Sequence, residues 1–427
     1  MSVKLFGLLF FVLLGMGLPI FLVLGGSAGL MFGVSGQPLV GIAQKMLDEM
    51  NSTTLLAVPF FVMAAAFMQH GGIAKALVDV AAAWVGWARG GLGVVCVAAC
   101  AMFAAICGSS VATALAMGTI LIPAMIARGY PRTFALGVTA ASGTLGILIP
   151  PSLPLILYAV IVDESVPRLF LAGVVPGILQ AGLFIAYVLW YGRRNDLARE
   201  PLRDSREFVR VNLRALPALS LPVIIAVGIY GGIVTTTEAA AFAAVVALLI
   251  ALFFYKGFPP GRTLSVIGDA IKSGGTIIII IACALAFGHW LTESGIPASL
   301  VRFITDNGFS AWQFLLAINI MLIVLGMFLE VASIILIAVP ILYPVLKPLG
   351  IDPVHFAIVI TINMELALIT APVGLNLYVL SSVSKTPIGV VIKGVNPFLV
   401  LMVGLLMLVT YIPEVSLWLP NLVYGGH

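Results

Sequence analysis

The chain has 427 residues, of which 62% are hydrophobic and 9% are charged, with 21 lysines and arginines against 17 acidic residues. An ordinary soluble domain is about 45–50% apolar and about 25% charged, so these few charges cannot cover a soluble particle of this size. The composition excludes a cytosolic enzyme, a disordered chain and an ordinary secreted domain, and the net charge of +4 gives no reason to expect a nucleic-acid partner. A lipid bilayer is therefore expected to surround most of the chain.

Apolar runs long enough to cross a bilayer, about 17–25 residues, recur from end to end. The first is expected to be a retained helix rather than a signal peptide, because no small-residue cleavage site and polar domain follow it. Alternating segments of about ten residues, which a β-barrel would need, are absent. The sequence thus predicts an all-α polytopic membrane protein. The predicted runs are 4–34, 52–70, 91–127, 133–162, 169–191, 215–231, 235–255, 273–291, 311–346, 354–384 and 395–412.

Basic residues indicate the orientation of these runs. Seven arginines fall between residues 192 and 215, and loops rich in Lys and Arg lie on the cytoplasmic side of a membrane. We therefore predict a cytoplasmic Arg-rich loop at 192–215 between two halves of the chain, with binding to anionic lipid or a partner as the alternative role. Counting helices outward from this loop places the N-terminus in the cytoplasm and the C-terminus on the opposite side.

Two of the runs, 91–127 and 311–346, are about twice the length of a single span and break at a glycine near the middle. The flanking charges put both ends of the first run on the cytoplasmic side and both ends of the second outside. Each run is therefore predicted to be a re-entrant helical hairpin, with one tip at Gly108 and the other just after Gly326.

Each hairpin is followed by a helix that prolines interrupt near the middle of the membrane. A shift of 222 residues lays the first of these helices on the second, pairing Pro131 with Pro353 and Pro150 with Pro372. Hairpins that enter from opposite sides, each followed by a broken helix, are typical of an inverted-topology repeat.

The broken helices also predict a chemistry. Proline removes an N–H group and displaces a carbonyl, so a break presents carbonyl oxygens, which suit Na⁺ together with Ser and Thr hydroxyls. The free N–H groups at half-helix N-termini favour a carboxylate. One tip and one break in each repeat therefore predict two ion sites around one substrate site.

Several polar residues at the tips and breaks are candidate ligands. Gly108, Ser109 and Ser110, with Thr113 one turn on, are candidates for ion or substrate coordination, and the alternative is that their hydroxyls only satisfy the backbone. Glu330, at the second tip, is an ionisable group inside the membrane and thus a candidate ligand, with helix N-terminal capping as the alternative. The polar residues of the breaks have packing at a kink as their alternative role. We predict that substrate contacts Ser110, Thr113, Ser142, Thr144, Glu330 and Asn376.

The most specific motifs are the two breaks, SGTLGILIPPS at 142–152 and APVGLN at 371–376, supported by GLPI at 17–20 and VPFF at 58–61. In these motifs the chain resembles, over nearly its whole length, the large membrane subunit of tripartite ATP-independent periplasmic (TRAP) transporters, within the ion-transporter superfamily. The resemblance implies an elevator-type transport domain that moves against a scaffold.

The resemblance implies a Na⁺-coupled secondary transporter of the bacterial inner membrane that imports an organic anion, such as a C4-dicarboxylate or a sialic acid, by alternating access. It implies two partners, a periplasmic substrate-binding protein and a small four-helix membrane subunit, which is expected to be a separate chain. With this family the C-terminus would be periplasmic. Na⁺ is the coupling ion, and no other metal, no cofactor and no enzymatic activity are expected.

The resemblance also implies two Na⁺ sites, each shared between a tip and a break. The chain departs from the family at Glu330, where Asp is common, and at Ala371, where a second Pro is common, and neither change removes an oxygen ligand. The implied ligands are Gly108, Ser109 and Ser110 with Gly146, Ile149 and Pro150 at the first site, and Gly326 with Thr370 and Pro372 at the second.

These predictions divide the chain into five parts and leave other functions open. A stand-alone carboxylate or ion carrier of the same superfamily is the main alternative, and a channel would need a continuous pore. An intramembrane hydrolase would need a Ser/His pair, paired Asp or an HExxH motif, and none is present.

The predicted parts are scaffold helices and an interfacial arm helix at 1–90, the first hairpin and broken helix at 91–162, further scaffold helices at 163–305, the second hairpin and broken helix at 306–384, and a C-terminal helix at 385–427.

Overall fold

The structure is a computed structural model that describes residues 15–34, 53–197, 204–258 and 263–425, and the single positions 10, 12, 13, 40, 44, 47, 50, 51, 199 and 261. The part of the predicted run 4–34 that precedes residue 15 therefore lies mostly outside the described residues.

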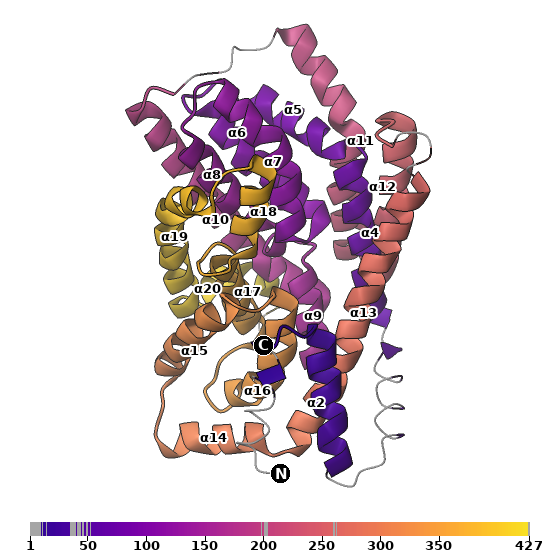
Figure 1. Ribbon diagram of the computed structural model, residues 1–427, viewed down its shortest axis with the longest axis vertical. Coiled ribbons are helices and arrows are strands. Elements are labelled where there is room, and N and C mark those ends of the chain that lie inside the picture. Colours follow the sequence, from indigo (N-terminus) through magenta and orange to yellow (C-terminus); the bar gives the residue numbers. More distant parts are fainter. Residues whose placement is uncertain are drawn as a thin grey trace.

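Every regular element among the described residues is a helix (Figure 1), which confirms the predicted all-α class. Within the described residues, seven helices are long and apolar enough to cross a membrane. In chain order the elements are α2 (Ile20–Val34), η1 (Thr53–Leu56), α4 (Ala57–His70), α5 (Ile73–Val85), α6 (Gly91–Cys107), α7 (Ser110–Ala127), α8 (Arg132–Thr144), η2 (Leu145–Ile147), α9 (Leu153–Val162), α10 (Val166–Arg194), α11 (Ser205–Tyr230), α12 (Thr236–Leu249), η3 (Ile250–Phe254), α13 (Thr263–Glu293), α14 (Ile296–Asp306), α15 (Ala311–Gly326), α16 (Val331–Leu346), α17 (Pro353–Leu368), α18 (Leu375–Ser384), α19 (Ile388–Tyr411) and α20 (Glu414–Tyr424).

The two double-length runs each fold as a pair of helices joined by a short tip. The first pair, α6 and α7, turns at Gly108, whose φ of 63° lies in the left-handed region that glycine adopts without steric cost. The second pair, α15 and α16, turns between Gly326 and Val331. Along the long axis in Figure 1, α6 and α7 lie in the upper half and α15 and α16 in the lower half. The helices thus break where the sequence predicts.

The helix after each hairpin is also interrupted. Residues 148–152 separate η2 from α9, and residues 369–374 separate α17 from α18. Pro150, Pro151 and Pro372 lie in these gaps, and proline cannot continue the hydrogen bonding of a helix because it has no N–H. The predicted Pro-broken helices are therefore present.

The Arg-rich segment is the first place where the structure differs from the sequence prediction. α10 continues to Arg194 and α11 begins at Ser205, so the predicted loop at 192–215 is too long at both ends. Arginine is a good helix former, and its long side chain reaches water from a helix as well as from a loop. The arginines that lie on α11, at four-residue spacing, are Arg206, Arg210 and Arg214.

Two further helices were not predicted as elements of their own. α14 is amphipathic and runs across the lower end of the molecule in Figure 1. α20 follows a break at Pro413. Both are 11 residues long. The elements were predicted as runs long enough to span a membrane, about 20 residues, and these two helices are shorter.

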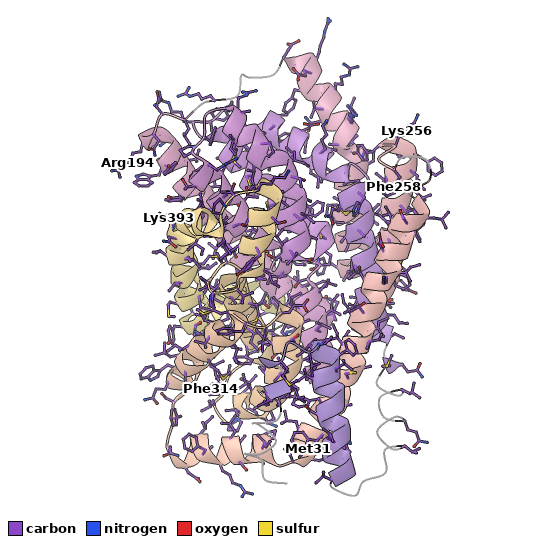
Figure 2. All side chains as sticks on the ribbon, viewed as in Figure 1. Met31, Arg194, Lys256, Phe258, Phe314 and Lys393 are labelled. Carbon is purple, nitrogen blue, oxygen red and sulfur yellow. The ribbon has the colours of Figure 1, made fainter. Side chains whose placement is uncertain are left out.

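Helix α4 packs against both α12 and α13, and these three helices are called the scaffold wall here. Helix α4 contacts α6 and α7 of the first hairpin, and α13 contacts α16 of the second. Helix α5 lies across the upper end and is tied to α11, because Trp84 Nε1 donates a hydrogen bond to Asn212 Oδ1 at 2.9 Å. Figure 2 places Arg194, Lys256 and Lys393 in the same half of the molecule and Met31 near the opposite end. The orientation in the membrane and the five-part division remain predictions.

Candidate functional site

A cavity of about 360 Å³, called the central cavity here, lies where the two hairpin tips meet the scaffold wall. The first tip and the starts of α7 and α9 line one side, and the starts of α16 and α18 line another. Helices α4 and α13 of the scaffold wall close it. The polar side chains that line it are Gln69, His70, Ser109, Ser110, Asp269, Ser273 and Glu330.

Of the four helix starts at the central cavity, α9 has its first N–H bonded to the Gly108 carbonyl, and the N-termini of the other three helices face the cavity. The first-turn residues Ser110 and Val111 of α7, Val331 of α16 and Leu375 of α18 all line it. First-turn N–H groups have no partner within their own helix, and a helix N-terminus carries about half a positive charge. The residues that line the cavity, all of them described, include no Lys and no Arg. Helix dipoles and backbone N–H groups are therefore the positive groups that this lining offers to an anion.

The first tip packs directly onto the first break. A Cβ on Gly146 would lie 2.6 Å from the Ser109 carbonyl oxygen and 2.7 Å from Thr113 Oγ1, so no side chain fits there. Thr113 Oγ1 donates to the Ser109 carbonyl at 2.8 Å, and the Leu153 N–H donates to the Gly108 carbonyl at 3.4 Å. On the break side, a Cβ on Gly108 would lie 2.7 Å from the Pro151 carbonyl oxygen. Oxygen atoms of the tip and of the break thus lie close together, which fits the donor set that Na⁺ takes at unwound helices.

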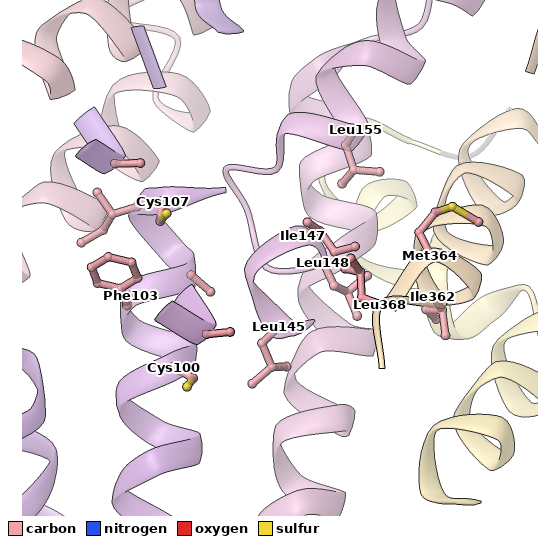
Figure 3. Close-up of a cluster of buried hydrophobic side chains, with 14 of the residues drawn as sticks. Cys100, Phe103, Cys107, Leu145, Ile147, Leu148, Leu155, Ile362, Met364 and Leu368 are labelled. Carbon is pink, nitrogen blue, oxygen red and sulfur yellow. The ribbon is translucent and has the colours of Figure 1, made fainter. Parts of the chain in front are cut away.

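An apolar shell surrounds this contact (Figure 3). Phe103 and Cys107 of α6 lie on one side of Leu145 in η2 and Leu148 in the break, and Leu368 of α17 lies next to Leu148. All five are buried. In such a low-dielectric shell, polar groups at the break interact more strongly than they would in water.

The second tip stands off the second break. A cavity of about 230 Å³ separates them, lined by the tip from Gly326 to Val331 and by Met364, Leu368 and Gly374. Glu330 lines both this cavity and the central one. Although Glu330 occupies the position before α16, its side chain makes no capping hydrogen bond.

A hydrogen bond between two buried side chains joins the two hairpin–break pairs near the central cavity. Asn376 Nδ2, in the first turn of α18, donates to Ser110 Oγ, in the first turn of α7, at 2.8 Å. Both side chains are buried. The two predicted ligands, 266 residues apart in sequence, are therefore neighbours at the edge of the central cavity.

Other predicted ligands lie away from the central cavity. Thr113 and Ser142 are buried, and Thr144 is buried beside α10, where Gln180 Nε2 donates to its Oγ1 at 3.0 Å. Ile149 lies on the first break with Pro150 and packs against α10. At the second break, Thr370 Oγ1 donates to the Leu366 carbonyl at 2.6 Å, and Pro372 is exposed. Their predicted roles as ligands remain predictions.

Four polar residues on the scaffold side of the central cavity were missed by the sequence prediction. They are Gln69 and His70 on α4 and Asp269 and Ser273 on α13. Asp269 precedes the predicted run 273–291, whereas α13 begins ten residues earlier than that run, at Thr263. Asp269 and Ser273 are four residues apart at the start of an apolar run, so they share one helix face. This spacing is the signal that the helix begins before the run.

The family model described as tripartite ATP-independent periplasmic transporter, DctM component, matches residues 7–415. The chain belongs to this family. The C4-dicarboxylate TRAP transporter large permease protein DctM of Pseudomonas aeruginosa is 43% identical over 380 residues, 89% of each chain. That of Rhodobacter capsulatus is 41% identical over 436 residues, 98% of each chain.

Two more distant matches show what family membership says about the substrate and about the fold. The ectoine/5-hydroxyectoine TRAP transporter large permease protein of Ruegeria pomeroyi is 33% identical over 388 residues, 90% of each chain. The crystal structure of the Alcanivorax borkumensis YdaH transporter matches with a TM-score of 0.63 at 15% identity, over 89% of this chain and 88% of YdaH. The match to YdaH shows a shared fold alone. The chain is thus a TRAP large permease, and the family predicted from its motifs is confirmed.

Proposed function

We propose that this TRAP large permease imports an organic anion, most simply a C4-dicarboxylate, in symport with Na⁺ and by alternating access across a bacterial inner membrane. The observation that supports this most is the convergence of three helix N-termini on a central cavity that no Lys or Arg side chain lines. Fixed backbone donors bind an anion without a permanent counter-charge, so the site stays reversible.

The tip–break contacts supply the coupling in this proposal. The carbonyls of Gly108 and Ser109 and the break around Gly146 hold one Na⁺, and the second tip with its adjacent cavity holds another. Binding of Na⁺ fixes the tips, and the tips carry the N–H donors of α7 and α16 that hold the substrate. Ion binding and anion binding therefore favour one another, as linkage requires when both depend on one arrangement of the chain.

The proposed partners are a periplasmic substrate-binding protein, which delivers the anion, and a small membrane subunit. Family membership supports both, and the names of the two relatives that are 41–43% identical support a C4-dicarboxylate. The ectoine relative shows that the family name alone does not select the substrate. No enzymatic step is proposed.

Proteoliposomes that contain the large permease and its small subunit test this proposal. Radiolabelled succinate uptake is expected only with an inward Na⁺ gradient and with the binding protein present. Equal uptake by the large permease alone would favour a stand-alone carrier. Uptake that is independent of Na⁺ and follows the substrate gradient passively would favour a channel, and either result contradicts the proposal.

A further inference from the structure

A buried acidic residue lies outside the tips and outside the central cavity. Glu365, in the last turn of α17, has no exposed surface, and neither of its carboxylate oxygens has a hydrogen-bond partner. Its nearest polar neighbours are Gln180 of α10 and Thr144 at the end of α8. Buried polar groups in proteins are almost always paired, so a carboxylate with two unpaired oxygens needs an explanation.

The neighbouring amide is unsatisfied on the same side. Gln180 is fully buried, and its Nε2 donates to Thr144 Oγ1 at 3.0 Å, while its Oε1 has no partner. Thr144 Oγ1 in turn donates to the Ala141 carbonyl at 2.8 Å, which fixes the hydroxyl. Two adjacent side chains therefore offer three oxygen acceptors without a partner. The donors that lie beside Glu365 make their hydrogen bonds elsewhere, Gln180 Nε2 to Thr144 and Thr144 Oγ1 to the Ala141 carbonyl.

The backbone adds further negative charge at this point. Thr144 ends α8 and Glu365 lies in the last turn of α17, and a helix C-terminus carries about half a negative charge. A carboxylate between two such ends is in an unfavourable place for an anion and a favourable one for a cation. A buried charge without a partner is strongly unfavourable, so a bound cation would stabilise the carboxylate here.

We propose that Glu365 and Gln180 form a third, buried Na⁺ site between the C-terminal ends of α8 and α17. The Glu365 carboxylate and Gln180 Oε1 are the ligands, and Thr144 is a positioning residue that holds the Gln180 amide. These are hard oxygen donors of the kind that alkali and alkaline-earth cations take. The inference rests on the proposed Na⁺-coupled import and adds a cation to it.

The site also links parts of the chain that the proposed transport cycle uses. Thr144 is two residues before Gly146, at the first break, and Glu365 precedes the second break by a few residues. A cation held between them ties the ends of α8 and α17 together while it neutralises the carboxylate. Its binding would favour one arrangement of both breaks, and so couple to the ions at the tips.

The test compares Glu365→Gln with the wild type in the complex with its small subunit. This variant keeps the shape and removes the charge, which is commonly neutral or stabilising for a buried ion. Added Na⁺ is expected to raise the unfolding temperature less in the variant than in the wild type, with choline as the control cation. The Na⁺ concentration for half-maximal uptake is expected to rise about tenfold, within the ~5–150-fold range of coupling between sites. The Hill coefficient for Na⁺ is expected to fall.

Two further variants sharpen the result. Gln180→Met removes the second ligand at similar length and is expected to weaken the Na⁺-induced thermal shift in the same direction. Glu414→Gln, at an exposed carboxylate at the start of α20, is the matched control and is expected to leave both curves unchanged.

The possible outcomes are distinct. A wild type without Na⁺-driven uptake overturns the proposed function and this site together. Na⁺-driven uptake in the wild type, with identical Na⁺ titrations and thermal shifts in Glu365→Gln, overturns this site alone. Unchanged Na⁺ curves with an altered dependence of uptake on pH would assign a proton to Glu365 and also overturn the Na⁺ site.

Discussion

The two hairpin–break pairs use the same parts but close differently. The first tip is packed onto its break, so that Gly146 has room for no Cβ beside the Ser109 carbonyl. The second tip is separated from its break by a cavity of about 230 Å³, with Pro372 exposed beside it. The first contact is between backbone atoms, whereas the second is close only at the base of the tip, where Gly326 meets Ala367.

The difference indicates which contact tolerates change. Backbone atoms cannot be shortened by substitution, so the first contact depends on glycine at one position. A contact between side chains can be restored by trimming the partner. We therefore expect the first pair to act as a fixed element and the second, which borders a cavity, to tolerate rearrangement.

Gly146→Ala is expected to have the largest effect and to abolish Na⁺-dependent uptake. The added Cβ must displace the Ser109 carbonyl, which the proposal assigns to Na⁺, in a fully packed region. Uptake into proteoliposomes, with expression and unfolding temperature as folding controls, measures this. Gly404→Ala, where a Cβ has nothing within 4 Å, is the matched control. Normal uptake by Gly146→Ala would show that the first contact is not a fixed element.

Gly326→Ala is expected to destabilise the protein by about 1–3 kcal/mol, because the new methyl group overlaps the Ala367 side chain. The double variant Gly326→Ala with Ala367→Gly is expected to recover most of the lost uptake and thermal stability, since trimming one methyl group makes room for the other. Thermal unfolding and uptake measure both. The equivalent attempt at the first pair, Gly146→Ala with Thr113→Ala, is expected to fail because the Ser109 carbonyl remains; rescue there would remove the contrast.

Ser110→Ala is expected to have a smaller effect on stability. It removes the acceptor at 2.8 Å from the buried Asn376 amide but leaves the Ala140 carbonyl at 3.4 Å. A double-mutant cycle with Asn376→Ala is expected to give a coupling energy of about 0.5–1.5 kcal/mol, typical of one hydrogen bond. Ser110→Ala should also raise the Na⁺ concentration for half-maximal uptake. An unchanged Na⁺ titration would remove Ser110 from the ion site, and a coupling energy near zero would separate the two pairs.

Asp269→Asn is expected to have the smallest effect. The exposed carboxylate on α13 lines the central cavity opposite the N-termini, and in water it repels an incoming anion by about 1 kcal/mol at 4 Å. Its removal should lower the KM for succinate by at most about fivefold without changing kcat. Ser273→Ala, one turn away, serves as the control. A raised KM would instead indicate a substrate with a cationic group that Asp269 attracts.

Much of this fold follows from local rules. The tip at Gly108 was predictable because only glycine adopts its positive φ without steric cost. The breaks at Pro150 and Pro372 were predictable because proline removes a helical donor wherever it stands. The Arg-rich loop was predicted too long because arginine, unlike glycine or proline, is compatible with both helix and loop and so does not mark where a helix ends.

The sequence by itself therefore determined the membrane environment, the all-α class, the family and the places where helices break, because each depends on composition or on residues near in sequence. Only the tertiary structure decided which broken ends meet. It placed Asn376 on Ser110, brought Asp269 of the scaffold wall to the central cavity and set Glu365 beside Gln180. These pairings depend on how distant helices pack, and an apolar sequence leaves that choice open because lipid and protein interior are almost equally apolar.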